Sequence, residues 1–320
     1  MKQMETVQLS YPLDSDKTYP PAVLAIGYFD GVHRGHQSVI RRARELAARL
    51  GVASAVMTFH PHPREVLGKS KLSGYITPLP DKLRQFARLG VDRTYVMKFD
   101  RLFADRTKEQ FVEEVLIPLQ VKGVVVGFNF CFGRGASGRA EDLKTLGEGR
   151  FCVEVIHPVL EGEIPVSSTR LREALAAGDV VTAEKILGRP HLVEGEVVTG
   201  DRRGRTIGFP TANLALTQPY AIPKRGVYLV SVALGDRWIP GVMNIGLRPT
   251  FQSPEPKLTL EVHLLRFEGD LYGKTLRVRF HRFLREERRF GSADDLVRQI
   301  REDVRRAEAI WPEIESGVRE

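Results

Sequence analysis

The pattern of apolar residues changes partway along the chain, and this change constrains the fold more than any other feature. From Ala22 onward, short apolar runs alternate with amphipathic segments, which is typical of successive βαβ units around a mostly parallel sheet. Past Pro190, strand-like stretches are separated by glycine, proline and aspartate turns, which favours a small antiparallel barrel. We therefore predict two domains, over residues 1–187 and 188–320.

Hydrophobic spacing predicts the elements of the first domain. Residues 22–26 form an unbroken apolar run and are expected to be a buried strand. Apolar residues recur at helical spacing over 36–50, and Gly51 stands where a C-terminal cap belongs. The other predicted elements are strands over 52–59, 93–99 and 121–126 and helices over 81–89, 107–119, 171–177 and 180–187. This part of the chain is therefore expected to be an α/β domain with a parallel sheet.

The second domain is predicted to be an all-β unit that forms a small barrel, followed by a terminal helix. That helix begins with Ser292 as its N-cap, and its apolar positions form one stripe. The predicted strands cover residues 192–198, 226–234, 237–242, 258–267 and 275–283.

Composition narrows the class of partner. The chain has 320 residues, and 48 basic against 40 acidic side chains give a net charge of +8, which leaves nucleic acid or a small phosphorylated molecule as the acidic partner. The basic excess is spread over both predicted domains in short runs, which argues against nucleic acid.

The two cysteines, Cys131 and Cys152, match neither a disulfide framework nor a zinc motif. No stretch has the pattern of a secretory signal or a membrane span, so we expect a cytoplasmic protein.

The densest functional signal is the sequence GYFDGVHRGH at residues 27–36, between the first predicted strand and helix. In a parallel sheet this is the carboxyl end of a strand, where ligands bind, and the following helix presents free N–H groups to an anion. The glycines let the backbone approach phosphate oxygens, and the imidazoles of His33 and His36 can donate to one phosphate. The segment therefore predicts a site that stabilises charge at a phosphorus under attack, with a tight turn bearing two surface histidines as the plainer alternative.

Hydroxyl groups gather at the start of a later predicted helix, in the sequence VSSTRLR at residues 166–172. They can simply cap that helix. With Arg172 one turn further on, Ser168 and Thr169 can instead hold a polyphosphate tail. From these residues alone, both interpretations stay open.

GYFDGVHRGH resembles the HxGH adenylyltransferase signature of bacterial bifunctional riboflavin kinase/FAD synthetases. The sequences TFHPHP at 58–63, GFNFCFG at 127–133 and SSTRLR at 167–172 are similar to that family's other N-terminal motifs, in the same order. The resemblance implies a Rossmann-like nucleotidyltransferase domain that transfers AMP from ATP to FMN without a protein nucleophile. The implied ATP-binding residues are Gly27, Phe29, His33, His36, Ser168, Thr169 and Arg172, of which His33, His36 and Arg172 are the expected catalytic groups. The residues implied near the flavin or the nucleotide are Phe59, His62, Pro63 and Asn129.

A loop at residues 201–214, DRRGRTIGFPTANL, carries the strongest signal of the second domain. Its glycines allow the loop to close over phosphates, and Thr211 and Asn213 offer oxygen ligands of the kind that Mg²⁺ accepts, provided that ATP and water complete the shell. An ordinary loop between strands explains the same residues equally well.

This loop is similar to the riboflavin kinase signature of the same family, and the later sequences GVY, NIGLRPTF and LEVHLL follow in the family's order. The resemblance implies that this domain is a six-stranded-type antiparallel β-barrel with a terminal helix. It also implies that Glu261 is the general base that takes the proton from the ribityl hydroxyl as it attacks ATP. It further implies that Arg285 and Phe290, in LREERRF, face the flavin ring. The implied ATP-binding residues are Gly204, Arg205, Gly208, Thr211 and Asn213, with Mg²⁺ held at Thr211 and Asn213.

Two other motifs suggest rival functions. GRGASG at residues 133–138 spells GxGxxG and would indicate an NAD(P)-dependent oxidoreductase with Glu154 as the ribose acid, but it follows a late strand rather than opening the sheet. The sequence GDLYGKT at 269–275 resembles a phosphate-binding Walker loop but is one residue short and separates two strands. The preferred hypothesis is therefore synthesis of FMN and FAD, with riboflavin, FMN, FAD and ATP as the small-molecule partners and neither nucleic acid nor membrane involved.

Overall fold

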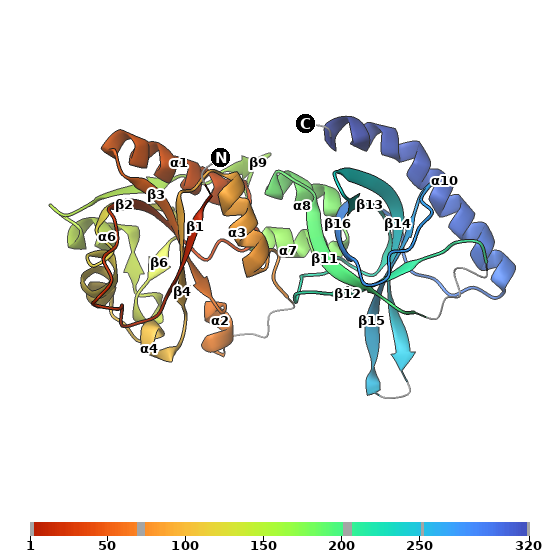
Figure 1. Cartoon of the computed structure of the whole chain (residues 1–320), viewed down its shortest axis with the longest axis horizontal. Helices are drawn as coiled ribbons and strands as arrows, with labels where there is room; N and C mark the ends of the chain where they lie inside the picture. Colours follow the sequence, from red (N-terminus) through yellow and green to blue (C-terminus); the bar gives the residue numbers. More distant parts are fainter. Residues whose placement is uncertain (1–2, 69–73, 201–206, 251–252, 319–320) are drawn as a thin grey trace. The chain divides into compact units, whose positions relative to one another are not determined.

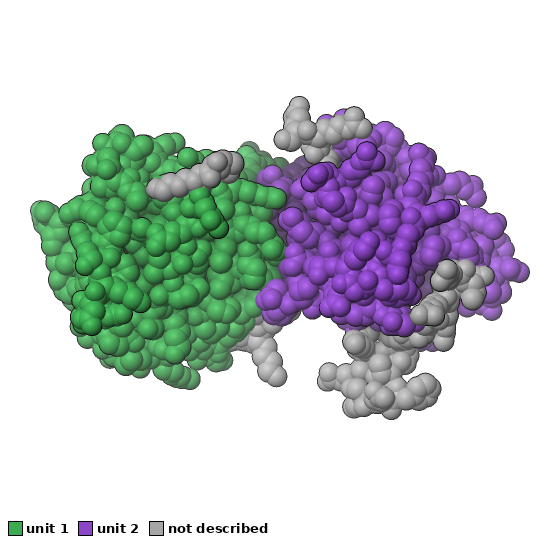
Figure 2. All heavy atoms as spheres, in the orientation of Figure 1, with its two compact units in different colours: residues 1–168 green, residues 169–320 purple. Residues whose placement is uncertain are grey.

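The computed structural model describes residues 3–68, 74–200, 207–250 and 253–318 (Figure 1). The chain divides into two compact units, residues 1–168 and 169–320 (Figure 2). This division falls after the first residue of α7 (Ser168–Ala177) and before α8 (Val180–Leu187), earlier than the predicted boundary at 187/188. The reason is packing: Val180 belongs to the hydrophobic core of the barrel, and the Lys224 N–H donates to the Leu175 carbonyl.

The first unit is built on a six-stranded sheet in which every pair of neighbours is parallel, as predicted. The strand order is β1-β4-β3-β2-β5-β8, and Figure 1 labels the first four strands of the chain, β1 to β4. The strands are β1 (Glu5–Leu9), β2 (Ala22–Ile26), β3 (Ala53–His60), β4 (Arg93–Lys98), β5 (Val121–Gly127) and β8 (Cys152–Ile156). The outermost strands, β1 and β8, were not among the predicted elements, because edge strands carry polar residues that break the apolar run.

Helices and smaller elements complete this unit. The predicted helix over 107–119 forms as a single α-helical turn that continues into a π-helical one. The elements are α1 (Arg34–Leu50), α2 (Pro63–Val66), α3 (Leu79–Arg88), α4 (Arg101–Ala104), α5 (Lys108–Phe111), the π-helix Val112–Leu116, β6 (Cys131–Phe132), the 3₁₀ turn Arg134–Ala136, β7 (Gly138–Arg139), α6 (Ala140–Leu146), β9 (Leu160–Glu161) and β10 (Ile164–Pro165).

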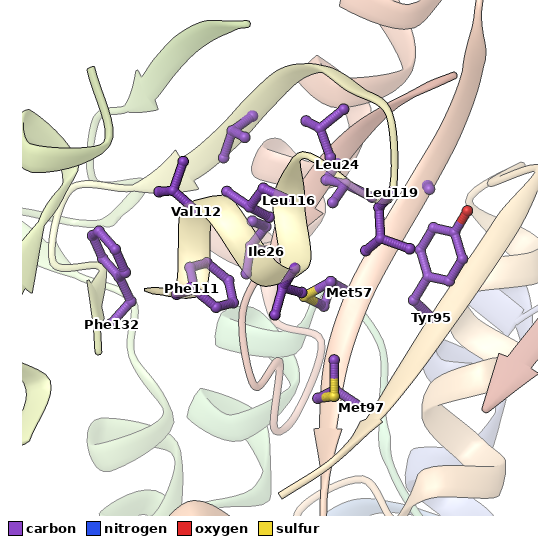
Figure 3. Close-up of a cluster of buried hydrophobic side chains, with 14 of the residues drawn as sticks. Leu24, Ile26, Met57, Tyr95, Met97, Phe111, Val112, Leu116, Leu119 and Phe132 are labelled. Carbon is purple, nitrogen blue, oxygen red and sulfur yellow. The ribbon is translucent and has the colours of Figure 1, made fainter. Parts of the chain in front are cut away.

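Both faces of the parallel sheet are covered, and successive residues of β2 pack into different hydrophobic clusters, one on each face. Leu24 and Ile26 of β2 pack with the π-helix residues Val112 and Leu116 on one face (Figure 3). Val23 and Ala25 pack on the other face, in the cluster that holds the apolar side of α1. A strand buried on both faces reads as an unbroken apolar run, which is why β2 was predictable.

The second unit is a closed antiparallel barrel in the order β11-β12-β15-β14-β13-β16. Its strands are β11 (His191–Val198), β12 (Ala212–Leu216), β13 (Gly226–Leu234), β14 (Arg237–Thr250), β15 (Ser253–Leu264) and β16 (Thr275–Arg285). The terminal helix, α10 (Ala293–Val318), packs against β14 and β16, and its residues Ala307 and Ile314 join a hydrophobic cluster that includes Val242 of β14 and Leu284 of β16. The six-stranded barrel with its terminal helix is as predicted, although β12 falls in a segment that was expected to be a loop. Among the described residues, no helix has the length and apolarity that a membrane span needs.

Candidate functional site

Three motifs of the first unit meet at one edge of the sheet. Gly27 follows β2, His60 ends β3, and Asn129 follows β5. Because β2 lies between β3 and β5 and all three are parallel, the three carboxyl ends lie side by side. This is the edge at which α/β sheets bind ligands.

The loop between β2 and α1 holds a conformation that is unfavourable for ordinary residues. Phe29 and Val32 have φ values of 56° and 42°, in the left-handed region that L residues with bulky or branched side chains rarely adopt. The surroundings fix this shape. Ser168 Oγ donates to the Asp30 carbonyl (2.9 Å), the Thr77 N–H donates to the buried Asp30 carboxylate (3.1 Å), and Gln37 Nε2 donates to the Val32 carbonyl (2.9 Å). Strain that is held in this way is a mark of a functional loop.

The two predicted histidines lie together at the N-terminus of α1. His33 is the N-cap and accepts a hydrogen bond at Nδ1 from the His36 N–H (3.3 Å). Their rings are stacked, with centroids 3.5 Å apart, and Phe29 meets His36 edge-on at 5.2 Å. A Cβ atom at Gly35 would lie 3.2 Å from the His33 ring, so the glycine of HxGH lets the two imidazoles converge.

The residues predicted near the flavin are only partly gathered. His62 lies at the same edge, with its ring 3.9 Å from that of Tyr28, and Pro63 opens α2 beside it. Asn129 is exposed at the end of β5. Phe59 instead turns toward the aromatic residues Phe99 and Phe103, with ring centroids 6.1 and 6.0 Å away, so packing uses part of its surface.

Sequence reasoning missed a buried lysine beneath this edge. Lys82 of α3 is 1% exposed, and its Nζ donates to the Tyr28 carbonyl (3.0 Å) and to Thr58 Oγ1 (3.3 Å). Burial lowers the pKa of Lys82 to about 8, against a smaller opposing effect of the Asp30 carboxylate. In the sequence this residue looks like one more charged position of an amphipathic helix, so no local pattern singles it out.

The hydroxyl-rich segment at residues 167–172 is the start of α7. Ser168 is tied to the loop between β2 and α1 through the Asp30 carbonyl. Thr169 and Arg172 follow in the first turns of α7, with Thr169 exposed and Arg172 partly exposed. Their role in binding phosphate remains part of the proposal below.

In the barrel, register places three of the polar side chains in one row. Glu261 of β15 lies opposite Asn213 of β12 on one side and Asn244 of β14 on the other. The neighbours of Glu261 along its strand, Leu260 and Val262, point into the core, so Glu261 points outward. The predicted general base and one predicted Mg²⁺ ligand are thus cross-strand neighbours.

The rest of the predicted kinase loop is described in part. Thr211 has the same outward orientation as Asn213, since Ala212 between them is buried in the core. Gly208 has a φ of 85°, a conformation that favours glycine. Gly204 and Arg205 lie outside the described residues. Within the described part of the chain, no group of three His, Cys, Asp or Glu side chains can hold a metal ion.

Arg285, predicted to face the flavin, is held by the terminal helix. Its guanidinium donates to both carboxylate oxygens of Asp303 (2.8–3.0 Å), and Asp303 is 4% exposed. Phe290 lies near the guanidinium carbons of Arg285 (5.7 Å) and Arg288 (5.0 Å), and Gln299 bridges Arg288 to Asp303. Sequence reasoning missed Asp303 and Gln299 because they lie on the inner face of a helix that was expected to be only a closing element.

The rival motifs do not have the geometry that their functions need. GxGxxG lies on the short hairpin of β6 and β7, joined by a 3₁₀ turn, and not between a sheet strand and a helix. Glu154, the acid of that hypothesis, is bound by Arg42 and Arg49. The segment at 269–275 connects β15 to β16 and precedes no helix.

Comparisons with known proteins cover both units. The family model for FAD synthetase matches residues 15–170, and that for riboflavin kinase matches residues 187–311. The bifunctional riboflavin kinase/FMN adenylyltransferase of Listeria monocytogenes is 38% identical over 98% of this chain and 100% of its own length. The protein of the same description from Escherichia coli K12 is 42% identical over 88% of this chain and 90% of its own.

A solved structure supports the same fold over nearly the whole chain. The crystal structure described as a macrolide-efflux protein from Streptococcus pneumoniae has a TM-score of 0.86 and 33% identity, and it covers 94% of this chain and 99% of its own. Together with the two family models and the curated relatives, this similarity shows that the chain belongs to the family of bifunctional riboflavin kinase/FMN adenylyltransferases.

Proposed function

We propose that the chain makes FMN and then FAD. The barrel transfers the γ-phosphoryl group of ATP to riboflavin, giving FMN and ADP. The α/β unit transfers AMP from a second ATP to FMN, giving FAD and pyrophosphate. The observation that carries the proposal is that the models of two different enzyme families match two successive parts of the chain. We further propose a cytoplasmic location, without nucleic acid or membrane partners.

In the adenylyl transfer, the protein positions the substrates and neutralises charge. His33 and His36, with the N-terminus of α1, donate to the ATP phosphates, while Gly27 and Phe29 shape the nucleotide site. An FMN phosphate oxygen attacks the α-phosphorus, and the bond to pyrophosphate breaks, so no protein nucleophile is needed. The triphosphate is held by Ser168, Thr169 and Arg172, and the flavin by Phe59, His62, Pro63 and Asn129.

In the phosphorylation, Glu261 accepts the proton of the ribityl 5′-hydroxyl as its oxygen attacks the γ-phosphorus. The hydroxyl of Thr211 and the amide oxygen of Asn213 are hard donors that fit Mg²⁺, and both lie on the outward face that carries Glu261. When bound with ATP, Mg²⁺ neutralises charge that develops on the phosphates. Gly204, Arg205 and Gly208 cover the nucleotide, and Arg285 and Phe290 contact the flavin ring.

The test separates the two reactions within one polypeptide. The purified chain is incubated with Mg²⁺, ATP and either riboflavin or FMN, and the flavins are separated by chromatography. Glu261→Gln should lower FMN formation by roughly 10²- to 10⁴-fold, as expected for a general base, and leave FAD formation from supplied FMN intact. His36→Ala should do the reverse. Failure of the wild-type chain to make FMN and FAD, or loss of both reactions in either variant, would refute the proposal.

A further inference from the structure

The lysine beneath the first site is unusual for its burial and for its partners. An ammonium group is almost never fully buried without a carboxylate, because its desolvation is costly. Lys82 is 1% exposed, yet its two hydrogen bonds go to neutral oxygens, the Tyr28 carbonyl and the Thr58 hydroxyl. The Asp30 carboxylate acts on it only through space. A fold that keeps such a group at a ligand-binding edge has a use for its charge.

The contacts of Lys82 join two of the motifs at that edge. Thr58 ends the buried part of β3, and its hydroxyl also donates to the Tyr28 carbonyl (2.9 Å), so Lys82, Thr58 and Tyr28 form a closed triangle of hydrogen bonds. The ammonium lies 3.9 Å from the centroid of the Tyr28 ring, which in turn lies 3.9 Å from the ring of His62. The Lys82 ammonium therefore contacts residues of both GYFDGVHRGH and TFHPHP.

The triangle acts on the loop where the strained backbone begins. Tyr28 directly precedes Phe29, the first residue with a positive φ, and its carbonyl is fixed by Lys82 and Thr58 together. His33 follows Phe29 by four residues and lies at the N-terminus of α1 as its N-cap. We propose that Lys82 is a positioning residue for adenylyl transfer: its buried ammonium fixes the loop that presents His33 and His36 and adds a positive charge beneath the phosphate site. This inference rests on the proposed function of the first unit.

Because Lys82 can lose its charge, FAD formation is expected to depend on pH. Around the ammonium lie the Asp30 carboxylate of the loop, which favours the charged form, and His60 of β3, whose own pKa is lowered by burial and by the nearby Lys82. On its own helix, Asp81 is paired with Arg84. Since the pKa of Lys82 is about 8, the kcat/KM for FMN should fall as pH rises above that value. The phosphate of FMN has completed its ionisation well below pH 8, so it contributes nothing to this decline.

The decisive variant is Lys82→Met, which keeps the length of the side chain and removes the charge. At pH 7.5, we expect the kcat/KM for FAD formation from FMN to fall by about 10- to 100-fold, the scale that follows from a small misplacement of catalytic groups, and the alkaline decline to disappear. Riboflavin phosphorylation should be unchanged. Lys98→Met is the matched control, because Lys98 ends the neighbouring strand β4 but is exposed and paired with Asp100, and it should behave as the wild type.

A second variant keeps the proposal testable if Lys82→Met does not fold. Thr58→Val preserves shape and removes one hydrogen-bond acceptor of the ammonium, which destabilises its charged form. The alkaline decline of FAD formation should then move to lower pH, a shift that loss of packing alone would not cause. The proposal is overturned if Lys82→Met retains wild-type kcat/KM, or if the decline is the same in Thr58→Val as in the wild type. Absence of FAD formation by the wild-type chain would instead refute the function assigned to the whole unit.

Discussion

Each unit places a buried or half-buried cation at its site, but the two cations are stabilised differently. Lys82 of the first unit has neutral hydrogen-bond partners and a lowered pKa, while Arg285 of the second unit makes a two-pronged ion pair with Asp303. A lysine loses its proton readily when it is buried, whereas an arginine keeps its charge at any physiological pH. We therefore expect FAD formation by the first unit to depend on pH and riboflavin binding by the second to depend on the Asp303 carboxylate.

Removal of that carboxylate should have the largest effect. Asp303→Ala leaves Arg285 partly buried without its counter-charge, and breaking such a pair costs about 3–5 kcal/mol. We expect the kcat/KM for riboflavin to fall by about 100-fold, mainly through KM, because the variant displaces Arg285 and not Glu261. Steady-state kinetics with riboflavin and with ATP as the varied substrate measure this split.

Another ion pair of the same helix provides the control for Asp303→Ala. Glu308 of α10 binds Arg266, which is exposed, and Glu308 is itself partly exposed, so Glu308→Gln should change stability and kinetics very little. FAD formation from supplied FMN should be normal in both variants. Equal loss of the two activities in Asp303→Ala would mean that Asp303 serves the whole chain and not the flavin end of the barrel.

A pair of glycine substitutions compares how tightly the two sites are packed. A Cβ atom at Gly27 would lie 2.8 Å from the ring of Phe29, which is itself fixed between Phe86 and His36. Overpacking of this kind costs about 1–3 kcal/mol, and we expect Gly27→Ala to lower FAD formation by about 10-fold. At Gly246, the corresponding atom would lie 2.5 Å from the flexible end of Glu287.

The side chain of Glu287 can move aside, so Gly246→Ala should have only a small effect on FMN formation. The fold-loss of FMN formation in this variant should be smaller than the fold-loss of FAD formation in Gly27→Ala. Both rates are measured on the same preparations, with the melting temperature as a check on folding. A larger loss of FMN formation in Gly246→Ala than of FAD formation in Gly27→Ala would show that the site in the barrel tolerates an added Cβ atom less well than the site in the first unit.

The smallest expected effect concerns a buried histidine of β16. His281 is buried, bonded to Ser231 at 2.8 Å, and lies near Arg279 and Arg282. Burial, helped by these two arginines, lowers its pKa to about 3. Between pH 6.5 and 3 the unfolded chain therefore binds a proton that the folded chain does not, so stability falls with falling pH.

We expect the free energy of unfolding of the second unit to drop by about 1 kcal/mol between pH 7 and pH 5.5 through this group. His281→Gln should flatten that dependence. Both tryptophans of the chain, Trp238 and Trp311, lie in the second unit, so their fluorescence during urea unfolding reports on that unit alone. An unchanged pH dependence in the variant would assign it to other groups.

The sequence alone determined the architecture of both units and the position of their main motifs. Buried strands such as β2 are unbroken apolar runs, and the helix stop at Gly51 is a left-handed cap, so local chemistry is enough to predict them. The placement of GYFDGVHRGH at the carboxyl end of a strand follows from the same local order. The edge strands β1 and β8 and the short β12 were not predicted because polar residues interrupt each of them, so none is an unbroken apolar run.

Only the tertiary structure decided which distant residues meet. Lys82 is separated by 54 residues from the Tyr28 carbonyl that it holds, and Asp303 by 18 from Arg285. Asn213 and Glu261 become neighbours through strand register. Burial, register and the stabilisation of a charge are properties of the assembled core, and no short stretch of sequence encodes them. This is why the motifs were visible in the sequence while the residues that position them were not.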